Sequence, residues 1–145
     1  MSDTKKPATS KSYDGFTAEE RLAMKEHAKE LKSRQSGGEA MDAAIADMTP
    51  ADRALAERFR AIVSENAPQL LPKTWYGQPA FANAEGKVVV FFQAAEKFKT
   101  RYATLGFSEE AKLDDGNMWV TSYALVKLTA DDEAVIAELV KKAVG

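Results

Sequence analysis

The run KVVVFF, residues 87–92, constrains the fold of this chain more than any other stretch. β-branched and aromatic residues are typical of strands, and the preceding residues 83–87, NAEGK, form a turn signature. Both alternating sets of the run are apolar: Val88, Val90 and Phe92 on one side, and Val89 and Phe91 on the other. A strand of this kind is covered on both faces, so we expect it at the centre of a sheet.

Helical patterns precede this strand. Thr17 and Glu20 have the spacing of a capping box, which predicts a helix that runs to about Arg34 and ends at Gly37 and Gly38. A second, short helix is predicted over residues 39–48. The apolar residues of the first helix are sparse, namely Leu22, Met24, Ala28 and Leu31. We therefore expect the first helix to be peripheral or to dock on a partner.

A third helix is predicted to begin after Thr49, with Pro50 at its first position and Asp52 in its first turn. Its expected apolar face is Ala51, Leu55, Phe59, Ile62 and Val63. Further strands are predicted over residues 101–107 and 117–128, and residues 96–102 are interpreted as a solvated edge strand.

The last helix should start at Thr129 and has an apolar face of Val135, Ile136, Leu139, Val140 and Ala143. N-terminal helices, then an antiparallel sheet, then a C-terminal helix indicate an α+β fold. Residues 1–15 are polar and aperiodic, which predicts a disordered tail. Residues 16–38 form the predicted peripheral helix, and residues 39–145 the α+β domain. The absence of a signal-peptide pattern and of a long apolar run predicts a cytoplasmic protein without a membrane partner.

The composition argues against several kinds of catalytic site and metal site. The chain has no cysteine, so it forms no disulfide and has no thiolate metal site. Its one histidine, His27, lies on the sparse first helix, and no nucleophile or phosphate-binding motif is recognisable. A net charge of -2 argues against a nucleic-acid partner. We therefore expect a protein that is not an enzyme, and acid–base chemistry at Asp114 or Asp115 ranks last among the alternatives.

Two aromatic segments make the candidate site. WYGQPAF contributes Trp75, Tyr76, Pro79 and Phe81, and LDDGNMW contributes Asp114, Asp115 and Trp119. Aromatic side chains placed in loops can wall a small pocket, with the two carboxylates as polar groups and weak metal candidates. Against this reading, aromatic residues commonly close a core, and Asp-Gly commonly forms a turn. The site requires the two segments to meet in space.

The segments KTWYGQPAF, GKVVVFFQAAEKFKTRYATLGF and LDDGNMW together resemble the YdhG-like domain family, over about residues 39–144. This family of unknown function is grouped with YjbR-like and frataxin-like folds, and some members are described as intracellular iron chaperones. Gln78 and Val120 depart from the pattern, where methionine and proline are expected.

The resemblance implies helices against a curved antiparallel sheet and a binding or chaperone role, with no established cofactor. Iron is implied by the resemblance alone, because helix 50–66 mixes arginines with its acidic residues and makes no acidic ridge. The ligand stays open between iron, a small molecule and a protein partner. The alternative function is a protein–protein interaction module that docks through the N-terminal helix.

Overall fold

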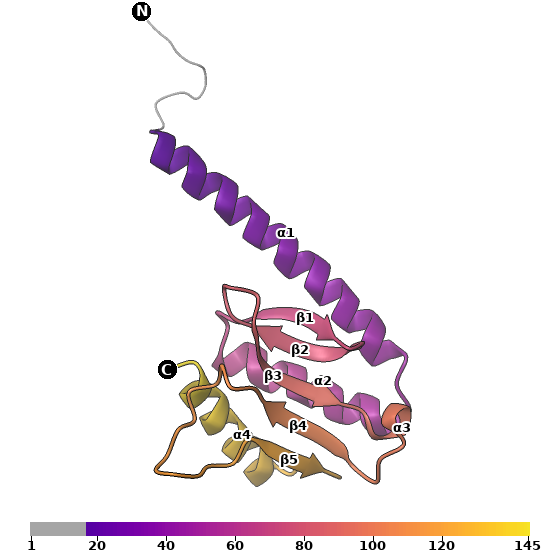
Figure 1. The fold of residues 1–145 in the computed structure, drawn as a ribbon. Coiled ribbons are helices and arrows are strands. Elements are labelled where there is room, and N and C mark those ends of the chain that lie inside the picture. The colour runs from indigo at the N-terminus through magenta and orange to yellow at the C-terminus, as the bar shows by residue number, and fades with distance from the viewer. Residues whose placement is uncertain (1–16) are drawn as a thin grey trace, which may run out of the picture. The chain divides into compact units, whose positions relative to one another are not determined.

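The computed structural model describes residues 17–145 and shows the expected α+β fold (Figure 1). The helices are α1 (Ala18–Ala46), α2 (Pro50–Asn66), α3 (Ala95–Phe98) and α4 (Ala130–Ala143). The strands are β1 (Leu71–Trp75), β2 (Gln78–Ala82), β3 (Val88–Gln93), β4 (Ala103–Phe107) and β5 (Ser122–Leu125). They form one antiparallel sheet in the order β1-β2-β3-β4-β5, with β3 at its centre as predicted. The tail predicted over residues 1–15 lies outside the described residues.

Residues 17–33 begin α1 and belong to a unit of their own. The predicted capping box is confirmed, because the Thr17 N–H donates to Glu20 Oε1 at 2.8 Å and the Glu20 N–H donates to Thr17 Oγ1 at 3.0 Å. Leu22, Met24 and Leu31 are exposed in this unit.

Gly37 and Gly38 do not end the first helix, and the separate helix predicted over residues 39–48 is the last part of α1. The reason is a close approach within the second unit, residues 34–145. A Cβ atom on Gly37 would lie 1.9 Å from the carbonyl oxygen of Pro72. The Arg34 guanidinium also donates to the carbonyl oxygens of Pro68 and Leu70, at 3.3 and 3.2 Å. Glycine is therefore needed for helix packing, and this part of α1 shields the start of β1.

The predicted third helix is confirmed as α2, with Thr49 as its N-cap. The expected face is wrong at one end, because Ala51 is exposed while the neighbouring Asp52 is buried. The Asp52 carboxylate accepts hydrogen bonds from the N–H groups of Ala95 and Glu96, at 3.3 and 3.0 Å. These bonds cap α3, so part of the segment interpreted as a solvated edge strand is a helical turn.

The segment WYGQPAF, residues 75–81, forms the turn and most of the second strand of a β-hairpin. Trp75 and Gln78 pair across it, and Tyr76 and Gly77 have φ angles of 52° and 76°, as a type I′ turn requires. Sequence reasoning missed both strands, each of which contains a proline, Pro72 in β1 and Pro79 in β2. A proline is tolerated in the edge strand β1, and the ladder between β2 and β3 starts only after Pro79.

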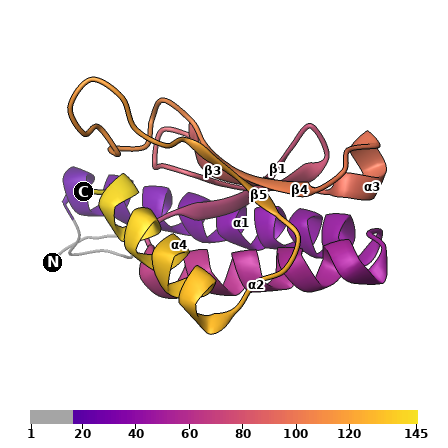
Figure 2. The same cartoon turned by 90° about the horizontal axis from the view of Figure 1, so that it is seen from below.

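The core lies between one face of the sheet and the helices α2, α4 and residues 34–46 of α1, which pack on that face (Figure 2). Phe59 of α2 is fully buried, with ring centroids 5.7 Å from Phe81 and 5.8 Å from Phe92. Within residues 34–145 no helix covers the other face of the sheet. On that face Phe91 is half-buried. Helices therefore cover β3 on one face, and the cover that we predicted for both faces is found only in part.

Helix α4 starts at Thr129 as predicted and is tied to α2 by an ion pair. The Arg58 guanidinium donates to both carboxylate oxygens of Glu133, at 2.9 and 2.7 Å. This bond holds the pKa of Glu133 below its ordinary value of 4.5 and raises that of Arg58. The ionised Glu133 therefore stabilises the fold above about pH 4.5, and its contribution is lost as pH falls through the lowered pKa.

Glu133→Gln should consequently be less stable than wild type at pH 7, and the difference should shrink as the pH falls below about 4.5. Urea unfolding followed by circular dichroism from pH 3 to pH 7 measures this. Glu138→Gln is the matched control, because Glu138 pairs only locally with Lys141 on α4 at 3.3 Å. A pH-independent difference for Glu133→Gln would contradict the assigned ion pair.

Candidate functional site

The structure does not bring the two predicted aromatic segments together. Trp75 lies at the β1–β2 turn. This turn is at the end of the sheet where β3 ends and β4 begins. Trp119 lies in the connection from β4 to β5, which leaves the opposite end of the sheet (Figure 1). Pro79 and Phe81 are buried in the fold. The predicted shared pocket is therefore wrong, and its residues divide into two groups.

The first group is an aromatic cluster at the hairpin. The Trp75 ring centroid lies 5.0 Å from that of Tyr76 and 5.1 Å from that of Phe91. Phe91 in turn rests on Gly106, where a Cβ atom would come within 2.3 Å of its ring. Trp75 and Phe91 thus pack on the helix-free face of the sheet, while Tyr76 remains 80% exposed.

The second group is the loop with Asp114, Asp115 and Trp119. Both carboxylates are exposed, and Asp115 borders a hollow that Trp119 also lines. Within residues 17–145, no three His, Cys, Asp or Glu side chains come together as a metal site would need. Iron binding at Asp114 and Asp115 stays a prediction from the resemblance.

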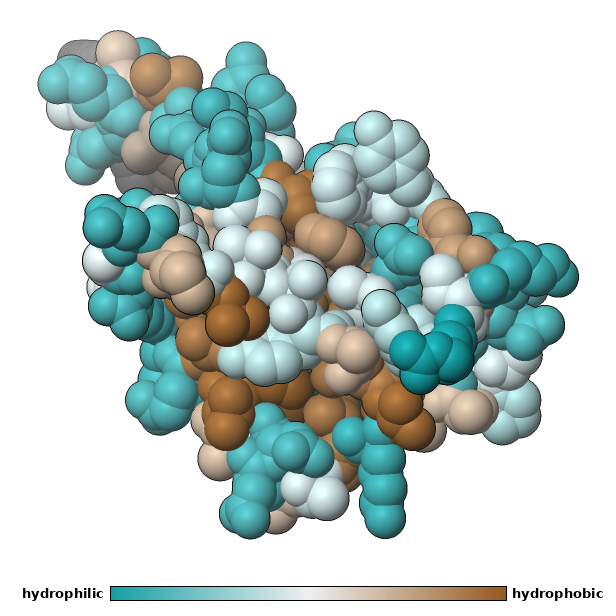
Figure 3. Space-filling view, turned by 60° about the horizontal axis from the view of Figure 1, so that its bottom comes forward, coloured by the Kyte–Doolittle hydropathy of each residue, from teal (hydrophilic) through white to brown (hydrophobic). Residues whose placement is uncertain are grey.

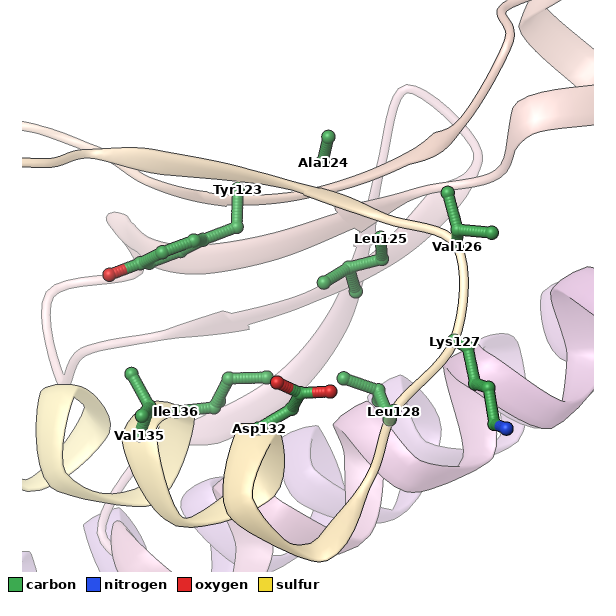
Figure 4. A pocket seen from close by; sticks show the side chains of 9 residues that line it. All are labelled: Tyr123, Ala124, Leu125, Val126, Lys127, Leu128, Asp132, Val135 and Ile136. Carbon is green, nitrogen blue, oxygen red and sulfur yellow. The ribbon is translucent and has the colours of Figure 1, made fainter.

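A hollow of about 500 Å³ lies between β5 and α4 (Figure 4). Figure 4 shows Tyr123 and Leu125 of β5 on the same side of their strand as α4, which contributes Val135 and Ile136 opposite them. The lining residues are Tyr123, Ala124, Leu125, Val126, Lys127, Leu128, Asp132, Val135 and Ile136. Its walls are mainly apolar side chains from β5, α4 and the connection between them.

A second hollow of about 440 Å³ adjoins the first, and Tyr123 lines both. It is lined by Leu113, Asp115, Met118, Trp119, Val120, Tyr123, Leu139 and Lys142. We call the combined area the β5–α4 surface, made by Met118, Trp119, Val120, Tyr123, Leu125, Val126, Val135 and Leu139. Figure 3, which brings the underside of Figure 1 forward, shows apolar residues gathered on this face. Met118 is 86% exposed and Val126 79%.

Charged side chains lie at the rim of the first hollow. Lys127 and Asp132 are both exposed, and Asp131 precedes Asp132 in the first turn of α4. The Thr129 N–H donates to Asp132 Oδ2 at 3.0 Å, which lowers the pKa of Asp132 and keeps it ionised. The surface thus combines apolar walls with separated charges, an arrangement suited to holding a ligand.

Sequence reasoning placed Asp115 and Trp119 in the candidate site but missed the rest of this surface, although one signal for it was present. The predicted apolar face of α4 included Val135 and Leu139, but the buried residues of α4 are Ile136, Val140 and Ala143. Val135 is 51% exposed. An apolar face wider than one stripe on a terminal helix indicates that part of it faces something besides the core.

No protein-family model matches the chain, and no curated protein or solved structure matches it either. Among the described residues, no helix is both long enough and apolar enough to cross a membrane.

Proposed function

We propose that this chain is a non-enzymatic binding protein and that its binding site is the β5–α4 surface. The observation that carries the proposal is the pair of adjoining hollows, whose walls expose Met118, Val126 and Val135 to solvent. Clustered exposed apolar residues commonly mark a place where a ligand or a partner is bound. The lining supplies apolar contact and rim charges, which hold and orient a ligand.

This proposal keeps the class of function that the YdhG-like resemblance implies and changes the place of the site. The apolar walls favour an apolar group of a ligand over a bare cation such as iron, which needs several oxygen or nitrogen donors. Docking through the N-terminal helix stays the alternative, which the exposed Leu22, Met24 and Leu31 favour.

A neutral apolar dye, N-phenyl-1-naphthylamine, tests the proposal through its fluorescence with the full chain. Val135→Glu puts a charge on the wall of the first hollow, at a position exposed enough to leave the core unchanged. We expect the dye to bind the wild type saturably and Val135→Glu at least about tenfold more weakly, because a buried charge costs more than 1.4 kcal/mol.

Leu31→Glu is the matched control, since it makes the same kind of change at an apolar residue of the N-terminal helix that is 53% exposed. Its dye affinity should equal that of the wild type. A loss confined to Leu31→Glu would favour the alternative site, and equal affinities for all three proteins would contradict the proposal.

A further inference from the structure

Resting on the proposed function, we propose that the partner is an extended segment of another protein. The segment adds to β5 as a sixth strand and places alternate apolar side chains in the hollow between β5 and α4.

Within residues 34–145, β5 is the last strand of the sheet, so no strand pairs with its outer edge. The Phe107 N–H donates to the Thr121 carbonyl oxygen at 2.7 Å, one step beyond the paired Gly106 and Ser122. Hydrogen-bonded pairs alternate along an antiparallel ladder, so Tyr123 and Leu125 turn their backbone groups toward β4. Ser122 and Ala124 therefore turn theirs outward, and both residues are exposed.

The two edges of the sheet differ in their protection. The start of β1 lies against α1 at Gly37, and the carbonyl oxygens of Pro68 and Leu70, just before β1, accept hydrogen bonds from Arg34. Proteins commonly block an exposed edge with a covering element, a proline or charged residues. Along β5 and the residue that follows it, Ser122–Val126, the chain places neither a charge nor a proline, and Val126 is among its most exposed apolar residues.

The hollow lies where the side chains of an added strand would point. A neighbouring strand would run about 4.8 Å from β5, with every second side chain on the side of α4. Those side chains would enter the hollow beside Leu125 and contact Val135 and Ile136. Backbone hydrogen bonds would then supply affinity and the hollow would select apolar residues, as in other cases of strand addition.

The rim charges set the chemistry of the added segment. Asp131 and Asp132 lie in the first turn of α4, beside the end of β5, and both are exposed. Complementary charge at an interface steers and orients a partner. An extended segment with lysine or arginine at one flank meets the same aspartates with opposite charge.

Selected peptides test the inference. Heptapeptides are selected from a random displayed library on the full chain, with Val135→Glu for counter-selection, and the best is synthesised. A scan then replaces each backbone N–H of this peptide by N–CH₃ in turn. We expect alternate N-methylations, those whose N–H faces β5, to weaken binding by about tenfold each. The intervening ones should leave the affinity within about twofold, because their N–H groups face solvent.

The two-residue period separates strand addition from simple side-chain binding. A scan without that period would overturn the inference, while dye binding that depends on Val135 would leave the proposed function standing. Failure to select any peptide that depends on Val135 would also overturn the inference. Sedimentation of the full chain tests whether a second copy of this chain is the occupant instead. A dimer that Val135→Glu dissociates would show that a second copy covers the edge and would overturn the inference.

Discussion

Replacing Gly37 by alanine is expected to lower the free energy of unfolding by at least about 2 kcal/mol, because overpacking at a rigid contact forces the backbone apart. The new Cβ would meet the Pro72 carbonyl oxygen at 1.9 Å, and neither α1 nor β1 can yield without disturbing the other. The gain in helix propensity from glycine to alanine, about 1 kcal/mol, does not offset this clash. Urea unfolding followed by circular dichroism gives the difference.

Gly38→Ala is the matched control on the same turn of α1. Its nearest neighbour would be Arg60 Nη2 at 3.6 Å, which is ordinary contact with a long side chain. This variant should therefore be more stable than the wild type by up to about 1 kcal/mol. Equal stabilities for the two variants would show that α1 does not lie on β1 at Gly37.

Asp52→Ala should have the second large effect, a loss of about 3 kcal/mol, because hydrogen bonds to a charged acceptor contribute more than neutral ones. The variant leaves the N–H groups of Ala95 and Glu96 without their carboxylate acceptor and removes the link between α2 and α3. Asp52→Asn keeps one acceptor oxygen and should lose about half as much. The same unfolding measurement compares them.

Asp47→Ala is the control, since Asp47 is an exposed carboxylate that follows the end of α1. It should change the free energy of unfolding by less than about 0.5 kcal/mol. An Asp52→Ala protein as stable as Asp47→Ala would mean that Asp52 does not hold α3 in place.

The local signals in the sequence predicted what local interactions determine. Thr17, Thr49 and Thr129 each cap a helix as expected, because the cap bonds join residues three apart. The central strand was predicted from residues 88–92 because the apolar character of both of its faces can be read within one short segment. Gly37 was misread, and the burial of Asp52 was missed, because the atoms that explain them belong to Pro72, Ala95 and Glu96, far along the chain.

The candidate site failed through the missed hairpin. Had residues 75–81 led directly into β3, Trp75 would have preceded β3, as Trp119 precedes β5. In an antiparallel sheet β3 and β5 start at the same end, so the two indoles would have met. The hairpin moves Trp75 to the far end of β1 and therefore to the opposite end of the sheet. An error of two strands thus separated the two halves of the predicted pocket.

Methyl NMR spectra of the full chain, titrated with N-phenyl-1-naphthylamine, test most directly whether the β5–α4 surface binds ligands. Saturable shifts should be confined to methyl groups that line the two hollows, chiefly those of Leu125, Val126, Val135 and Ile136. Leu22 and Leu31 on the N-terminal helix, and Val88 on β3, should not move. Shifts confined to those three residues, with the β5–α4 methyl groups unchanged, would contradict the account.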